Sequence, residues 1–97
     1  MTKVVNLKKE KYDVYIGRGS IFGNPYTHLP LKGTKATVQV KTRCEAVEKY
    51  RVYFYDRIEN DTEFLDEVLR LKDKVLGCYC SPKECHGDII TEFLNKI

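Results

Sequence analysis

The most informative stretch of this 97-residue sequence is a short apolar run close to its C-terminal end, residues 75–79. It consists of Val, Leu, Gly, Cys and Tyr, with no charged residue among them. A continuous apolar run of this length is typical of a strand that is buried on both faces. We therefore predict that this segment is the central strand of a sheet.

Two segments near the N-terminus are candidates for further strands. Residues 4–7 and 12–16 are short and contain β-branched and aromatic side chains. Residues 37–40 alternate polar and apolar side chains, which fits either a short extra strand or an extended lead-in to a helix. Residues 17–33 contain glycine and proline without clear periodicity, which predicts a long loop. Long ordered loops in small domains often carry function.

Three segments have the apolar periodicity of amphipathic helices. Residues 43–58 follow a capping-box pattern at 42–45, and Asp61 or Thr62 caps a second helix. A third helix is expected to begin at the Ser-Pro pair at 81–82 and to close the chain. This order predicts a single α/β domain over all 97 residues, with a mixed sheet of three to four strands and three helices.

The charge of the chain is distributed unevenly along its length. Residues 1–43 carry nine Lys or Arg against two acidic residues, a net of +7. Residues 44–97 carry eight against twelve, a net of −4. The basic part includes the long loop, which favours an anionic ligand. The alternative is that the N-terminal lysines form a solvated strand edge that opposes aggregation.

The sequence contains no apolar run long enough for a signal peptide or a membrane span, so we expect a cytoplasmic protein without a membrane partner. In a reducing compartment, cysteines are buried thiols, metal ligands or reactive groups more often than disulfides. The four cysteines are Cys44, Cys78, Cys80 and Cys85.

The first candidate site is the glycine-rich loop, residues 17–25, which directly follows a predicted strand. Ligands of open α/β sheets bind at the carboxyl ends of strands. The glycines allow backbone N–H groups to approach a ligand, and Arg18 offers a planar donor fork to phosphate or carboxylate. The spacing matches neither a P-loop nor a dinucleotide fingerprint, and a tight structural turn is the alternative. The residues expected to bind ligand are Gly17, Arg18, Gly19, Ser20, Phe22, Gly23 and Asn24.

The second candidate site is residues 78–88, which run from the central strand into the last helix. The side chains expected to face a ligand there are Cys80, Pro82, His86, Gly87 and Asp88. A tetrahedral zinc site is an alternative, but the ligand spacing is atypical, so we expect no metal and no other cofactor. The four residues of that alternative are Cys78, Cys80, Cys85 and His86.

Catalysis is a further interpretation of the same segment. Near a helix N-terminus, the thiol of Cys85 would act as a nucleophile, because the helix dipole lowers a thiol pKa. His86 would act as general acid or base, with Asp88 nearby. In the simplest interpretation the cysteines are small buried residues, and His86 takes a ligand or a backbone carbonyl as its partner.

Taken together, the motifs resemble domain-of-unknown-function family 4326, small proteins of bacteria and their phages. The resemblance covers nearly the whole chain and rests on Asn6, residues 13–20 with 23–25, residues 77–80, and Pro82 with residues 85–88. It implies that the two motifs belong to one site, to which Asn6 contributes. It also suggests, by analogy with small phage proteins, a role in sequestering or degrading host nucleotide signals.

We therefore expect a protein that binds a nucleotide-like anion, such as a cyclic or ADP-ribose-derived signal. The first alternative is a hydrolase or transferase that acts on a nucleotide or glycosidic bond. The second is a zinc-binding nucleic-acid module, which the acidic second part of the chain disfavours. The seven tyrosines offer either a base-stacking platform or packing residues. A pocket completed across a homo-oligomer interface is compatible with so small a domain.

Overall fold

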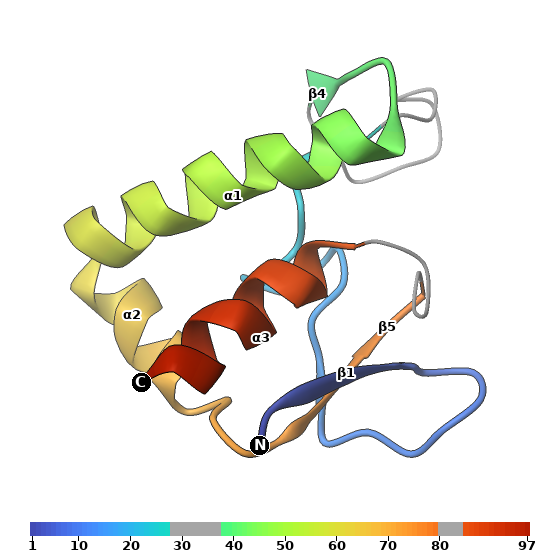
Figure 1. The fold of residues 1–97 in the computed structure, drawn as a ribbon, viewed down its shortest axis with the longest axis vertical. Coiled ribbons are helices and arrows are strands. Elements are labelled where there is room, and N and C mark those ends of the chain that lie inside the picture. The colour runs from blue at the N-terminus through green and yellow to red at the C-terminus, as the bar shows by residue number, and fades with distance from the viewer. Residues whose placement is uncertain (28–37, 80–84) are drawn as a thin grey trace.

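The computed structural model describes residues 1–27, 38–79 and 85–97, and three helices and two small sheets make up this part of the chain (Figure 1). The α/β class is confirmed, although the strands form two parallel sheets instead of one mixed sheet. The expected helix start at 81–82 lies outside the described residues. The elements are β1 (Lys3–Asn6), β2 (Val14–Tyr15), β3 (Tyr26–Thr27), β4 (Val38–Gln39), α1 (Arg43–Asn60), α2 (Thr62–Leu69), β5 (Val75–Cys78) and α3 (His86–Lys96).

As predicted, β5 is the central strand of the larger sheet, whose order is β1-β5-β2. Both neighbours run parallel to it, with Val4 and Val14 each in register with Leu76. The carboxyl ends of all three strands therefore lie at one edge of the sheet. The glycine-rich loop follows β2 and the Cys-His segment follows β5, so both leave from this edge.

The helices cover one face of this sheet. Leu76 and Cys78 are fully buried there, in a core that includes residues of α1, α2 and α3. The approach of α3 depends on Gly87, because a Cβ at this position would lie 2.8 Å from Val4 Cγ2 and 2.9 Å from Ile16 Cδ1. α1 packs in turn against α3 and α2 (Figure 1).

The opposite face of β5 is covered by an aromatic ring. Gly77 is buried beneath Tyr12, so close that a Cβ on Gly77 would lie 2.6 Å from Tyr12 Cγ. The prediction of a strand buried on both faces is thus correct at Leu76, Gly77 and Cys78, but the two faces are covered by different parts of the protein. The core covers one side and a tyrosine side chain covers the other.

The helix starts follow local capping chemistry. At the start of α1, Thr42 Oγ1 accepts the N–H of Glu45 at 3.0 Å, and at the start of α2 Asp61 Oδ1 accepts the N–H of Phe64 at 3.1 Å, as the sequence predicts. α3 differs, because its N-cap is Cys85, which is extended with φ −152° and ψ 170°.

The capping partner in α3 is the carboxylate of Asp88, which accepts the N–H of Cys85 at 3.1 Å. This Cys85–Asp88 pair has the same i, i+3 spacing as the expected pattern at 81–84. Helix α3 consequently begins at His86, four residues beyond the Pro82 that the sequence pattern favours.

The smaller sheet pairs β3 with β4 in parallel beside α1. β4 confirms the extra strand, whereas β3 lies where the sequence predicts only loop, because two residues are too few to show a period. The two ends of the described chain are joined: Thr2 N–H donates to Asn95 Oδ1 at 3.0 Å, and Asn95 Nδ2 donates to Thr2 O at 3.1 Å. None of the helices in the described ranges is long and apolar enough to cross a membrane.

Candidate functional site

The glycine-rich loop is held in shape by its own side chains. Arg18 Nε donates to the carbonyl of Asn24 at 2.9 Å, and Arg18 Nη2 donates to the carbonyl of Tyr26 at 2.9 Å. Ser20 Oγ donates to the carbonyl of Gly17 at 2.6 Å. Charge-assisted bonds of the Arg18 kind are stronger than neutral ones, so the loop is pre-organised before any ligand arrives.

Asn24 ties this loop to the first helix. Its side chain is buried, donates to the carbonyl of Ala46 at 3.1 Å and accepts the N–H of Tyr26 at 2.8 Å. The turn also requires glycine at two places. Gly19 has a φ of 98°, and a Cβ on Gly23 would lie 2.8 Å from Arg18 Cα. Much of the motif is therefore explained by the turn itself.

The loop leaves a small hollow at the surface, with a volume of about 140 Å³. Binding pockets for whole small molecules are usually about 300 Å³ or larger, so this hollow accommodates a group the size of a phosphate and not a complete nucleotide. Phe22 is not part of the hollow, because its ring lies in the core beside Phe64. The residues that line the hollow are Arg18, Gly19, Ser20, Gly23, Asn24 and Pro25.

His86 joins the second motif to the first. Its Nε2 donates to the carbonyl of Ile16 at 2.6 Å, and its ring packs edge-on against Tyr50 at 5.2 Å. Burial lowers the pKa of His86, and the positive charge of Arg18 acts in the same direction. The neutral ring is therefore favoured, and of the two partners considered for it, the backbone carbonyl is present.

Two of the clustered cysteines, Cys78 and Cys85, are in contact in the core. The Sγ atoms of Cys78 and Cys85 are 3.2 Å apart, and both side chains are buried. Cys80 and Pro82 lie outside the described residues. Within the described ranges, no group of three or more His, Cys, Asp or Glu side chains is arranged to hold a metal ion. Cys44 lies apart from the cluster, exposed on α1.

Some of the tyrosines for which the sequence left open a base-stacking or a packing role lie close to this sheet edge. The hydroxyl of Tyr15 donates to the carbonyl of Arg18 at 2.8 Å, and the Tyr15 and Tyr79 rings lie edge to face at 6.2 Å. Asn6 joins the group through its Nδ2, which donates to the carbonyl of Tyr79 at 3.3 Å. Desolvation raises the pKa of Tyr15, so its hydroxyl stays protonated and able to donate. We call Tyr12, Tyr15 and Tyr79 the tyrosine face.

The signal for the tyrosine face was present in the sequence. Tyr79 directly follows β5, two residues after Gly77, so the alternation of the predicted strand 75–79 assigns both to one face. Tyr15 pairs in register with Gly77, which places it on that face as well. Recognising this arrangement requires the strand register, which only the structure supplies.

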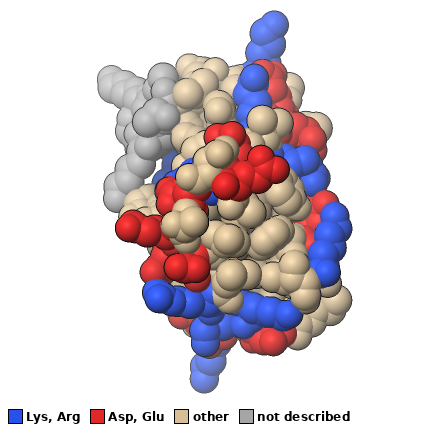
Figure 2. Space-filling view, turned by 90° about the vertical axis from the view of Figure 1, so that its left-hand side faces the viewer, with Lys and Arg blue, Asp and Glu red and all other residues tan. Residues whose placement is uncertain are grey.

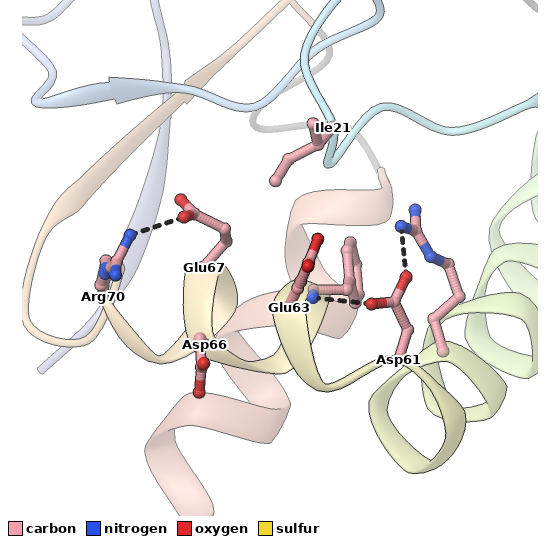
Figure 3. A pocket seen from close by; sticks show the side chains of 8 residues that line it. Ile21, Asp61, Glu63, Asp66, Glu67 and Arg70 are labelled. Atoms are coloured by element: carbon pink, nitrogen blue, oxygen red, sulfur yellow. Dashed lines mark hydrogen bonds and ion pairs between the residues drawn. The ribbon is translucent and has the colours of Figure 1, made fainter.

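A second, larger hollow lies between Ile21 and the α1–α2 junction, with a volume of about 330 Å³. Figure 3 shows Glu63 and Glu67 directed toward Ile21 from α2. Arg57 and Arg70, the two basic residues of the lining, are each paired with an acidic side chain. Figure 2 shows acidic side chains gathered on this side of the molecule. The larger hollow therefore disfavours an anion, in contrast to the loop.

Comparison of the sequence with known proteins places the chain in a family. The sequence pattern of the family described as domain of unknown function (DUF4326) matches residues 2–96, and the chain belongs to this family. It is 34% identical over 97 residues to the "Uncharacterized 12.4 kDa protein in nrdA-td intergenic region" of Enterobacteria phage T4. That alignment covers 100% of this chain and 81% of the phage protein. Comparison with solved structures gave no match.

Proposed function

We propose that this protein binds an anionic, nucleotide-like small molecule at the carboxyl edge of the β1-β5-β2 sheet. The observation that carries the proposal is the hollow of about 140 Å³ that the glycine-rich loop forms around Arg18. A phosphate group of the ligand would occupy this hollow. Parallel sheets place their ligands at this edge, since the strands end there and the following helix directs its positive end toward it.

Arg18 is the principal ligand-binding residue in this proposal. Two of its N–H groups bond to loop carbonyls, so the guanidinium is already held beside the hollow. Ligand binding therefore does not have to immobilise this side chain. Asn24, His86 and Asp88 have hydrogen-bond partners inside the protein. Phosphate recognition would therefore fall mainly to Arg18 and to backbone N–H groups of the loop.

The contacts of the second motif favour binding over turnover. Cys85 and His86 are buried, and the His86 ring already bonds to the carbonyl of Ile16. A protein that holds a ligand without converting it is suited to sequestration. With a phage protein among its relatives, we propose that the ligand is a host nucleotide signal, such as a cyclic nucleotide or an ADP-ribose derivative.

The direct test is mass spectrometry of small molecules released when the purified protein is denatured, followed by calorimetry. The calorimetric ligands are pyrophosphate, nucleoside diphosphates, cyclic dinucleotides and ADP-ribose. We expect at least one of them to bind and to be recovered chemically unchanged. Recovery of a hydrolysed or transferred product would support the enzyme alternative, and no binding across the whole panel would overturn the proposal.

A pair of arginine substitutions locates the site. Arg18→Gln should weaken binding of pyrophosphate by ten-fold or more, since a hydrogen bond to a charged group contributes about 1.5–3 kcal/mol. Arg70→Gln, in the acidic hollow, is the matched control and should leave the affinity unchanged. Because Arg18 also fixes the loop, Arg18→Lys is included to retain the charge without the two-pronged geometry. Melting temperatures of all three variants would separate loss of binding from loss of folding.

A further inference from the structure

The loop hollow is too small for a whole nucleotide, so the remainder of the ligand must lie on an adjoining surface. Tyr15 connects the hollow to such a surface, because its hydroxyl donates to the carbonyl of Arg18 while its ring contacts Tyr79. The tyrosine face and the loop therefore meet at one residue. The acidic second hollow lies instead beside Ile21 and α2.

The tyrosine face is built to leave ring surface open. Tyr79 is 59% exposed and Tyr12 is 43% exposed, unusually high for aromatic side chains next to a buried strand. Two of the tyrosine side chains closely approach glycine backbone. A Cβ on Gly77 would lie 2.6 Å from Tyr12 Cγ, and a Cβ on Gly17 would lie 2.6 Å from Tyr15 Cε1. The glycines thus let these two side chains pack closely against the main chain.

The charge around these rings suits an anionic aromatic ligand. Lys8 Nζ lies 5.6 Å from the centroid of the Tyr79 ring. Lys9 and Lys11 are exposed in the same turn between β1 and β2, with Glu10 as the acidic residue between them. Asp13, at the end of this turn, uses its carboxylate to accept the N–H of Val75 at 2.8 Å.

We infer that the tyrosine face is the base-binding half of the same site, on which the base of a small nucleotide stacks against Tyr79 beside Tyr15, while Lys8, next to the Tyr79 ring, adds positive charge that favours an anionic ligand. This inference rests on the proposed nucleotide function. Stacking suits any base, because every base has a π face, and the lysine turn selects the anionic form. The loop hollow and the tyrosine face then divide the ligand between them, phosphate on one and base on the other.

The experiment compares pyrophosphate with nucleoside diphosphates by calorimetry, on the wild type and on a Tyr79 series. The signals of the tyrosine rings are followed by NMR. A nucleoside diphosphate should bind at least ten-fold more tightly than pyrophosphate and should shift the Tyr79 and Tyr15 ring signals. Tyr79→Leu should remove this advantage without changing the pyrophosphate affinity, and Tyr79→Phe should retain it. Lys8→Gln should weaken nucleotide binding, whereas Lys49→Gln, an exposed lysine on α1, should not.

The outcomes separate this inference from the proposed function. Pyrophosphate and nucleotide binding of equal strength, unaffected by Tyr79→Leu, would overturn the base site and leave the loop site standing. Nucleotide binding that responds to Tyr79→Leu but not to Arg18→Gln would support the tyrosine face and overturn the loop site. No binding of either ligand would overturn both. A single-stranded oligonucleotide that binds far more tightly than its mononucleotide would overturn the assignment to a small ligand.

Discussion

The two faces of β5 differ in what covers them and in how tightly. On the helix-covered face, Leu76 and Cys78 are closed into the core. On the other face, Gly77 lies against the side chain of Tyr12, and Tyr79, which directly follows the strand, is mostly open to solvent. The sheet around β5 thus has a buried, stabilising face on one side and an accessible aromatic surface on the other. Substitutions on the two faces should consequently separate into effects on folding and effects on binding.

The largest effect is expected on the core face. Leu76→Ala should lower the free energy of unfolding by about 2–5 kcal/mol, because it removes buried methyl groups and leaves a cavity. Urea denaturation followed by circular dichroism measures this directly. Val52→Ala, at an exposed position on α1, is the matched control and should change stability by less than about 0.5 kcal/mol. A similar small value for Leu76→Ala would mean that this face is not packed as described.

Two glycine-to-alanine substitutions apply the same chemical change to the two faces of the sheet. Gly87→Ala should destabilise by about 1–3 kcal/mol, since its Cβ would press on Val4 and Ile16, which are packed in or against the core. Gly77→Ala should also destabilise, because its Cβ would lie 2.6 Å from Tyr12 Cγ and 3.1 Å from Tyr12 Cβ, and rotation of the ring does not move Tyr12 Cβ. A Gly87→Ala or Gly77→Ala variant as stable as the wild type in thermal unfolding would contradict the close contact described at that glycine.

The buried His86, which joins the two motifs, should make the free energy of unfolding depend on pH. Because burial lowers the pKa of His86 in the folded state, the folded protein binds fewer protons than the unfolded chain below the unfolded pKa of about 6.5. Stability is therefore complete above that pH and falls as the pH decreases, by at most about 1.4 kcal/mol per pH unit from this group. Denaturation between pH 7.5 and 5.5 should show a shallower slope for His86→Gln. An unchanged slope would contradict the role assigned to His86.

The smallest effect on folding is expected for the tyrosine face. Tyr79→Leu should change the free energy of unfolding by less than about 0.5 kcal/mol, because the side chain is mainly exposed. The same variant is the one expected to lose nucleotide affinity. A large loss of stability in thermal denaturation would show that Tyr79 is a packing residue, and the contrast between the faces would disappear.

Local signals in the sequence predicted much of this architecture. The apolar run at 75–79 identified the central strand, and the Thr42 and Asp61 caps were correctly placed. The sequence also placed both motifs directly after strands, and the parallel pairing seen in the structure brings them to one edge. The family resemblance was confirmed over residues 2–96.

Features that depend on distant contacts could not be predicted in this way. Cysteine is an unusual N-cap, so the pairing of Cys85 with Asp88 gave no recognisable signal. The bond from His86 to Ile16 joins residues 70 positions apart. Arg18 was assigned to a ligand from its chemistry alone, and its two bonds within the loop became visible only in three dimensions. Whether these groups also contact a ligand remains a prediction.

The position of β5 between β1 and β2 also sets the order in which the chain can fold. In the described part of the chain, both N-terminal strands of the sheet pair only with β5, through contacts such as Asp13 with Val75, 62 residues apart. During synthesis, β1 and β2 must therefore wait until residues 75–78 have left the ribosome. Such long-range pairing slows folding and leaves strand edges open in the meantime. The lysines that flank β1 would then protect a nascent strand edge long before they meet a ligand.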